Sequence, residues 1–431
     1  MLSREWIGMD KLVIDGGRKL KGKVEVSGAK NSALPILAAA LLSEEESVIE
    51  NVPNLKDILT MMKLLHALGA RTQYDPETLT LVIKPGRDLK PFAPYKLVST
   101  MRASVCVLGP LLARLGYAEV SLPGGCVIGP RPIDLHLKGL RGLGAQIDVQ
   151  HGYVLAKAKR KLRGGEIFLG GAFGSSVLAT GNVMMAATLA NGKTYIENAA
   201  CEPEVVDLAI FLKKMGAKIQ GEGSPRIEVE GVKRLQGAQH RIISDRIETG
   251  TYLVAGALTG GDILIENMIP EHQNALLDKM LQSGVKIERK NNSVRVRRNG
   301  RLKAVDVTTL PYPGFPTDLQ AQMMALMSIT PGISIITEKI YPDRFIHVAE
   351  LNRMGSQIFL EGNSAIVHGV KRLSGAPVTA SDLRASAALL LAGLVAEGTT
   401  EVHRVYHLDR GYEKIEEKFS RLGARIRREK E

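Results

Sequence analysis

The sequence predicts two α/β globules, each built from three copies of one repeating unit. Three observations support this fold class. Six amphipathic helices end at evenly spaced glycines, a more apolar helix precedes each of them, and short alternating strands follow both kinds of helix. Self-similarity at a fixed period indicates one supersecondary unit repeated along the chain.

The amphipathic helices are recognised by a last turn in which Leu, Met or Ser stands directly before glycine. Successive glycines are 68 to 75 residues apart, at Gly69, Gly144, Gly216, Gly284, Gly355 and Gly423. Each is expected in the left-handed conformation that commonly ends a helix. Segments such as 71–74, 146–149 and 218–221 follow and read as strands.

The second set of helices is more apolar. They begin near Asn31, Arg102, Ser176, Asp245, Asp318 and Asp382. Stretches such as 33–42, 179–190 and 385–396 are apolar on all sides, so we expect these helices to be buried. The unit therefore consists of a buried helix, a strand, an amphipathic helix, a strand and at least one further strand.

Three such units make a globule of ordinary domain size. Internal symmetry places the hinge near residues 238–244. The expected globules are 30–243 and, together, 1–29 and 244–431. A short strand at 11–16 is left over at the N-terminus and is expected to complete the second globule.

Composition restricts the function classes. The three cysteines, Cys106, Cys126 and Cys201, have no paired spacing, which argues against a disulfide framework or a CxxC metal site. We expect a cytoplasmic protein without export signal or transmembrane segment. The net charge of +12 suggests anionic ligands, either nucleic acid or phosphorylated metabolites. Only 4% of residues are aromatic, and the basic runs at 157–161 and 425–428 look like solvated faces, so nucleic acid is the weaker alternative.

The six buried-helix starts differ in charge. The first half of the chain offers Lys30 with Asn31, Arg102, and Ser175 with Ser176, whereas the second half offers Asp245, Asp318 and Asp382. Helix N-termini attract anions. Ordinary capping explains some of the aspartates but not the cations, which oppose the helix dipole. The cations are therefore interpreted as ligand groups for a phosphorylated molecule.

The loop 121–132 places Cys126 after two glycines and five residues before Arg131. Glycine allows such a loop to move and proline fixes parts of its path, and an active-site lid requires both properties. A guanidinium lowers the pKa of a neighbouring thiol, which suits a proton donor or a nucleophile. A glycine-rich turn with an incidental cysteine is the alternative.

Several motifs resemble those of the UDP-N-acetylglucosamine 1-carboxyvinyltransferases, a family of enolpyruvyl transferases. They lie at 27–31, 101–104, 122–126, 131–136, 245–250, 315–322, 382–386 and 409–413. The resemblance extends over essentially the whole chain from Met9. It implies two inside-out α/β barrel globules of three βαβαββ units each, with the active site in the cleft between the domains.

The resemblance implies transfer of the enolpyruvyl group of phosphoenolpyruvate to the 3′-hydroxyl of UDP-N-acetylglucosamine, the first committed step of peptidoglycan synthesis. Cys126 matches the family's proton donor and Asp318 the carboxylate that accepts the hydroxyl proton. Lys30, Arg131 and Arg410 match groups that bind the phosphate and carboxylate of phosphoenolpyruvate.

Other positions match substrate-binding residues of the family. They are Asn31, Arg102, Pro132, Ile133, Asp134, Leu135, His136, Ser175, Ser176, Val177, Asp245, Ile340, Asp382 and Arg384. For Arg384, a salt bridge with a neighbouring Asp is an equal alternative to substrate contact. No metal cluster or cofactor fingerprint is found in the sequence, so we expect no cofactor, no metal and no membrane insertion.

The sequence departs from the family pattern at several places. Leu178 replaces a glycine near the diphosphate, Gly174 stands where some members have lysine, and 341–344 reads Tyr-Pro-Asp-Arg. Cys201 and Cys106 are interpreted as structural. Two alternatives stay open: 5-enolpyruvylshikimate-3-phosphate synthase, whose pattern has Ser in place of Ala29 and Asn31, and a non-catalytic paralogue that binds UDP-sugar.

Overall fold

The computed structural model describes residues 10–124, 132–298 and 300–431. Cys126 and Arg131, together with the rest of 125–131, lie outside the described residues. Contacts divide the chain into two compact units, of which the first runs from Ser27 to Ile243 and is here called the inserted unit. The second contains the chain up to Val26 and Ser244–Glu431, and is called the terminal unit. Each unit has its own hydrophobic core.

The inserted unit contains three repeats. The first is β14 (Gln239–Arg241), α1 (Lys30–Ala39) with η1 (Ala40–Leu42), β3 (Ser47–Glu50), α2 (Lys56–Ala67), β4 (Arg71–Asp75) and β5 (Thr80–Lys84). The second is β6 (Phe92–Ala93), α3 (Tyr95–Val98), η2 (Arg102–Val107), α4 (Leu108–Leu115), β7 (Tyr117–Ser121), α5 (Asp134–Gly142), β8 (Gln146–Gln150) and β9 (Tyr153–Lys157). The third is β10 (Glu166–Phe168), α6 (Val177–Ala187), β11 (Lys193–Glu197), α7 (Pro203–Lys214), β12 (Lys218–Gln220) and β13 (Arg226–Glu230).

The terminal unit also contains three repeats. The fourth is β2 (Lys21–Glu25), α8 (Arg246–Thr259), β15 (Asp262–Glu266), η3 (Pro270–Gln273), α9 (Asn274–Gln282), β16 (Lys286–Lys290) and β17 (Ser293–Arg297). The fifth is β18 (Val307–Thr308), η4 (Thr317–Leu319), α10 (Gln320–Ser328), β19 (Ile333–Thr337), α11 (His347–Arg353), β20 (Gln357–Glu361) and β21 (Ser364–His368). The sixth is β22 (Pro377–Thr379), α12 (Leu383–Gly393), β23 (Thr399–His403), η5 (Val405–Arg410), α13 (Ile415–Arg421), β24 (Arg425–Lys430) and β1 (Asp10–Asp15).

Every repeat builds a four-stranded sheet with the same connectivity. In β10-β11-β13-β12, for example, the first pair is parallel and the other two are antiparallel. The N-terminal strand β1 lies between β23 and β24, as predicted. The βαβαββ repeat is thus confirmed, although the sheets of the described residues stay separate and close no barrel.

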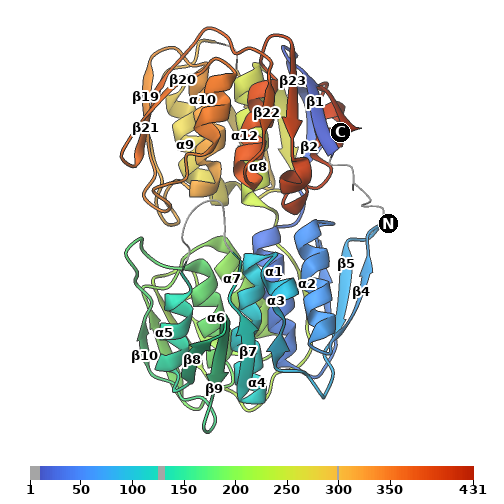
Figure 1. Ribbon diagram of the computed structural model, residues 1–431, viewed down its shortest axis with the longest axis vertical. Coiled ribbons are helices and arrows are strands. Elements are labelled where there is room, and N and C mark those ends of the chain that lie inside the picture. Colours follow the sequence, from blue (N-terminus) through green and yellow to red (C-terminus); the bar gives the residue numbers. More distant parts are fainter. Residues whose placement is uncertain (1–9, 125–131, 299) are drawn as a thin grey trace, which may run out of the picture. The chain divides into compact units, whose positions relative to one another are not determined.

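The helices predicted to be buried form the cores. Residues 33–42 and 179–190 are buried throughout, and 385–396 is buried apart from Val395. In the inserted unit, α1 and α6 lie between β10 on one side and β4 and β5 on the other (Figure 1). In the terminal unit, α8, α10 and α12 pack against one another.

All six predicted glycines end helices in the left-handed region, with φ between 86° and 100°. The N–H of the residue after each glycine reaches back five residues, as Ala70 does to the carbonyl of Leu65 at 2.9 Å. The glycine N–H bonds the carbonyl three residues earlier, as Gly69 does to His66 at 3.0 Å. This pair of bonds is the Schellman motif, so the six helices share one C-terminal cap.

Candidate functional site

The terminal unit contains an ion-pair cluster centred on Asp318. Oδ1 of Asp318 accepts a hydrogen bond of 2.8 Å from Nη1 of Arg344. Oδ2 accepts from Nε and Nη2 of Arg384, at 3.1 and 3.0 Å. The two arginine side chains are 7% and 4% exposed, whereas that of Asp318 is 26% exposed. The cluster therefore buries its cations and leaves part of the carboxylate accessible.

Burial and charge act in opposite directions on this cluster. Burial by itself raises the pKa of Asp318, but the charges of Arg384 and Arg344 outweigh it and hold that pKa far below its usual range. Burial lowers the pKa of each arginine, and the attraction of Asp318 together with other nearby groups more than reverses this effect. As the structure stands, Asp318 is ionised and a weak proton acceptor.

The elements explain how these side chains meet. Asp318 lies in η4, directly before α10, and Arg384 is the second residue of α12, which packs against α10. Asp382 caps α12, because its Oδ1 accepts from the backbone N–H of Arg384 at 2.8 Å and of Ala385 at 3.1 Å. Asp245 caps α8 in the same way.

Asp318, in contrast, caps no helix, since its oxygens face the two arginines and η4 has no side-chain cap. The alternative that Asp318 is only a helix cap is therefore wrong. For Arg384, the salt bridge that the sequence left open is present. This bridge joins two of the predicted site residues directly.

A second carboxylate, which is buried, holds the segment around Asp318 in place. Glu338 is fully buried, and its Oε1 accepts from the hydroxyl of Thr309 at 2.6 Å and from the N–H groups of Ile340 and Tyr341 at 2.8 and 3.0 Å. Its Oε2 accepts from the hydroxyl of Thr317 at 2.9 Å. The predicted residue Ile340 thus enters the cluster through its backbone.

Thr317 connects the two carboxylates. Its Oγ1 donates to Glu338 and accepts from Nη1 of Arg344 at 2.9 Å, and Arg344 in turn bonds Asp318. Because Glu338 takes the hydroxyl hydrogen, the lone pairs of Thr317 are directed toward Arg344. Glu338 therefore orients Arg344, and through it the carboxylate of Asp318.

The remaining predicted residue of the terminal unit is Arg410, the last residue of η5, which packs against α12. It is partly buried, and its charge together with burial lowers the pKa of the neighbouring His407. Tyr412, two residues further on, lies under Arg384, whose Cζ is 5.5 Å from the ring centroid. Arg410 is therefore on an element that contacts the helix of Arg384.

In the inserted unit, Lys30 is the first residue of α1 and is almost fully buried. Its Nζ lies 3.1 Å from Oδ2 of Asp57, in the first turn of α2, and that carboxylate is also buried. A buried ammonium requires such a counter-charge. The predicted conflict between Lys30 and the helix dipole is therefore offset by a carboxylate that sequence reasoning missed.

Arg102 and His136 are both close to the segment that begins at Pro132, the first by a hydrogen bond and the second by its place in α5. Nη2 of Arg102 donates to the carbonyl of Pro132 at 3.1 Å. His136 is buried in α5, and its Nδ1 lies 2.9 Å from Nδ2 of Asn182. Because that amide also donates to the carbonyl of Val105, the Asn182 amide is the donor and Nδ1 the acceptor. Burial and the charge of Arg102 lower the pKa of His136 to about 3, so its ring is neutral.

Most of the other predicted positions of the inserted unit are at least partly exposed. Asn31, Leu135, Ser175 and Val177 are partly buried, Asp134 is exposed and Ile133 is buried. Ser176 caps α6, with its Oγ accepting from Ala179 N at 3.4 Å.

Two departures from the family pattern have structural explanations. Gly174 has a φ of 93°, a conformation that disfavours the lysine found in some members. Leu178 packs against the core of its unit.

The two described cysteines look inert. Cys106 is fully buried, and burial raises the pKa of its thiol to about 12. Cys201 is partly buried, and burial together with Glu202 raises its pKa too. Within the described ranges, no group of three His, Cys, Asp or Glu side chains is placed to hold a metal ion, and no helix is long and apolar enough to cross a membrane.

Comparisons with known proteins agree with the fold. A family model described as EPSP synthase (3-phosphoshikimate 1-carboxyvinyltransferase) matches residues 14–419. Among solved structures, the enolpyruvyl transferase NikO from Streptomyces tendae superposes with a TM-score of 0.88 at 25% identity, over 98% of this chain and 100% of NikO. EPSP synthase from Acinetobacter baumannii gives a TM-score of 0.74 at 19% identity over 98% of this chain and 100% of that one, which shows the fold alone.

Curated relatives are much closer in sequence. The UDP-N-acetylglucosamine 1-carboxyvinyltransferase of Methylacidiphilum infernorum (isolate V4) is 56% identical over 420 residues, covering 97% of this chain and 99% of the relative. The protein of the same name from Myxococcus xanthus (strain DK1622) is 55% identical over 424 residues, covering 98% of this chain and 100% of the relative.

Proposed function

The chain belongs to the EPSP synthase family of enolpyruvyl transferases, and from this premise we propose that it is a UDP-N-acetylglucosamine 1-carboxyvinyltransferase. It transfers the enolpyruvyl group of phosphoenolpyruvate to the 3′-hydroxyl of UDP-N-acetylglucosamine and releases phosphate. The observation that carries the proposal is the identity of 54–56% to relatives of this name over 97–98% of the chain. This identity favours UDP-N-acetylglucosamine over shikimate 3-phosphate as the acceptor.

A non-catalytic paralogue is disfavoured because the residues needed for chemistry are present. A proton must reach the methylene carbon of phosphoenolpyruvate while the sugar hydroxyl attacks the neighbouring carbon. We assign the proton donor to Cys126, because a donor with a pKa near the operating pH is favoured. We assign the binding of phosphate and carboxylate to Lys30, Arg131 and Arg410.

The pairing of Lys30 with Asp57 supports its assigned role. The carboxylate balances the charge of the buried ammonium and fixes its position at the start of α1. An ammonium held in this way needs no rearrangement before it binds a phosphate, and such preorganisation is a main source of electrostatic stabilisation.

Asp318 is assigned as the acceptor of the sugar hydroxyl proton. Two guanidinium groups now make it a poor base. An anionic substrate that draws Arg344 or Arg384 away from the carboxylate raises the pKa of Asp318 and makes it a better acceptor. In this proposal, binding of the phosphorylated donor and activation of the base are coupled.

The proposal extends to the first committed step of peptidoglycan synthesis, to a cytoplasmic location and to sensitivity to the epoxide fosfomycin.

Cys126→Ser is expected to be nearly inactive, because an alcohol is too weak an acid to protonate carbon. Cys126→Asp is expected to keep measurable activity and to resist the epoxide, since a desolvated carboxylic acid has a raised pKa and no thiol. Full activity of Cys126→Ser would remove this residue from the mechanism.

Phosphate release tests the proposed acceptor. The enzyme is incubated with phosphoenolpyruvate and either UDP-N-acetylglucosamine or shikimate 3-phosphate. Release with the nucleotide sugar alone is expected. Release with shikimate 3-phosphate alone would establish the alternative enzyme, and release with neither would favour the non-catalytic paralogue.

A further inference from the structure

A basic hollow of about 1000 Å³ lies in the inserted unit, and Lys30 is not among its lining residues. Its walls include Leu42, the last residue of η1, and Ser43, which follows it, whereas Lys30 begins α1. At 1.5 Å per residue, α1 alone separates the two ends by about 15 Å. The hollow is therefore at the opposite end of this buried helix from Lys30.

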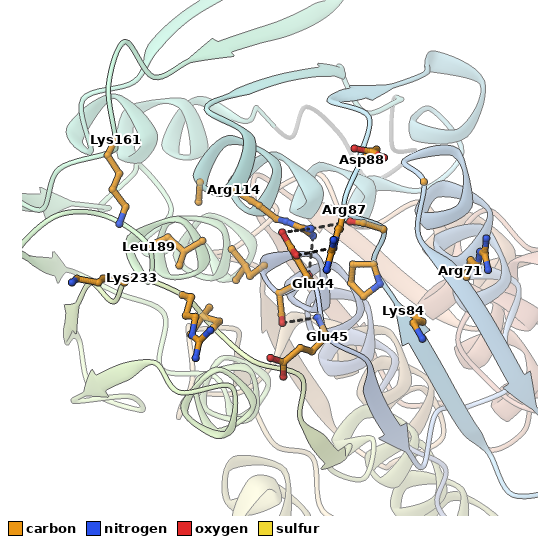
Figure 2. Close-up of a pocket in the computed structure, with 18 residues that line it drawn as sticks. Glu44, Glu45, Arg71, Lys84, Arg87, Asp88, Arg114, Lys161, Leu189 and Lys233 are labelled. Carbon is orange, nitrogen blue, oxygen red and sulfur yellow. Dashed lines mark hydrogen bonds and ion pairs between the residues drawn. The ribbon is translucent and has the colours of Figure 1, made fainter.

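Positive charge dominates its lining. The basic side chains are Arg71, Lys84, Arg87, Arg114, Lys161, Lys233 and Arg234, and the acidic ones are Glu44, Glu45 and Asp88. Figure 2 shows Lys161 and Lys233 on one side of the hollow, and Arg71 and Lys84 on the other. Among the described residues, these four and Arg234 form no ion pair, so most of the positive charge is not balanced locally.

Three equivalent loops supply much of this charge. They follow β5, β9 and β13, and each has one or two basic residues within the two positions before a buried leucine: Arg87-Asp88-Leu89, Arg160-Lys161-Leu162 and Lys233-Arg234-Leu235. The leucines are 8%, 3% and 6% exposed. The anchored leucine fixes each loop on the core. Lys161, the last residue of the run 157–161 interpreted from the sequence as a solvated face, lines the hollow.

The floor of the hollow is a built structure. Nη1 of Arg114 donates to the carbonyls of Leu41 and Ser43 at 2.9 and 2.8 Å, and Nη2 donates to that of Gly86 at 2.8 Å. Arg114 thereby satisfies carbonyls at the end of the buried helix, where the helix dipole is negative. Glu44 lies between Arg87 and Arg114, at 3.7 and 3.8 Å. The remaining basic side chains of the lining do not have this structural role.

The chemistry of the lining restricts the ligand. Among the described residues no aromatic side chain lines the hollow, so these offer no platform for stacking a nucleobase. Its concave shape suits a compact ligand better than a flat membrane surface. Arginine and lysine together bind phosphate oxygens well, and several cations that converge on one ligand bind a multiply charged anion most strongly. We propose that this hollow binds a short chain of phosphates, an oligophosphate without an aromatic base.

Calorimetric titration with inorganic tripolyphosphate tests the proposal. The variant Lys84→Gln/Lys161→Gln/Lys233→Gln removes one exposed cation from each of three parts of the lining. The control Lys63→Gln/Lys96→Gln/Lys214→Gln removes the same net charge from exposed lysines elsewhere in the unit. We expect the first variant to bind tripolyphosphate roughly tenfold more weakly, from the usual strength of three exposed charge pairs, and the control to bind as wild type. Both variants should keep wild-type turnover.

Three outcomes would overturn the proposal: equal losses in both variants, no binding by wild type at low salt, or a loss confined to the control. A hexaglutamate titration distinguishes the class of anion. Tighter binding of hexaglutamate than of tripolyphosphate, lost in the first variant only, would assign the hollow to an acidic polypeptide and contradict the phosphate assignment. Because turnover is measured separately, a failure of the oligophosphate proposal does not affect the proposed transfer reaction.

Discussion

Replacing Asp318 by asparagine leaves two buried guanidinium groups facing an uncharged amide. The amide preserves the shape of the side chain and one acceptor oxygen, but it balances neither Arg344 nor Arg384. Removing one partner of a buried ion pair typically costs about 3–5 kcal/mol. We expect about 3 kcal/mol, the lower end of that range, because the Asp318 side chain is 26% exposed.

The cost should depend on pH in a defined direction. The pKa of Asp318 is lowered in the folded protein, so its contribution to stability is complete above its unfolded pKa of about 3.9. It is lost as pH falls below that value. The stability difference between wild type and Asp318→Asn should therefore be constant from about pH 6 to 8 and shrink below about pH 4.

Turnover should fall as well, by about 10²–10⁴-fold, the usual effect of losing a general base.

Stability is measured by hydrogen exchange of peptides from α10 and α12 during urea unfolding, which reports on the terminal unit. Asp382→Asn and Asp245→Asn make the same chemical change at two helix caps. They should cost less than about 1 kcal/mol, because asparagine caps as well as aspartate. Equal costs at all three positions would refute the ion-pair account.

Three further outcomes follow from the structure. Thr317→Val should lower kcat more than it raises KM, because it removes the hydroxyl that links Glu338 to Arg344. Thr309→Val removes a bond to the other oxygen of Glu338 and should change stability more than kcat. Steady-state kinetics and thermal unfolding separate the two effects, and identical kcat losses would contradict the orienting role. Cys106 should stay unlabelled by iodoacetamide at pH 8 in the native protein, as mass spectrometry can verify, since it is buried with a pKa of about 12. Gly216→Ala should cost about 1–2 kcal/mol from backbone strain alone, because its φ is 100° and nothing lies within 4 Å of the new Cβ; an unchanged unfolding midpoint would disprove this.

The repeat and the burial of its helices were predictable because they depend on local signals. A helix end that requires a left-handed residue selects glycine, and a helix surrounded by neighbours is apolar on every side. The glycine signal recurs six times in the sequence, and the structure confirms it at Gly69 and its five equivalents. The N-terminal strand was predictable for a related reason, since the symmetry left one sheet short of a strand.

The contacts of the candidate site were less predictable. Arg344 and Glu338 lie in irregular segments 26 and 20 residues after Asp318, where no periodicity indicates which way a side chain points. Asp57 looked like an ordinary acidic residue in the first turn of a helix, although it is buried against Lys30. These partners are set by tertiary packing. The motif that surrounds Asp318 predicts its importance, but not that two arginines hold it.

The central claim is best tested by running the reaction in deuterium oxide and identifying the product by NMR. UDP-N-acetylglucosamine and phosphoenolpyruvate should give one phosphate and one nucleotide sugar that carries the enolpyruvyl group on its 3′ oxygen. Protonation of the methylene carbon followed by loss of a proton should leave deuterium in the product's vinyl group. An unmodified sugar, attachment at another oxygen, or a product free of deuterium would contradict the account.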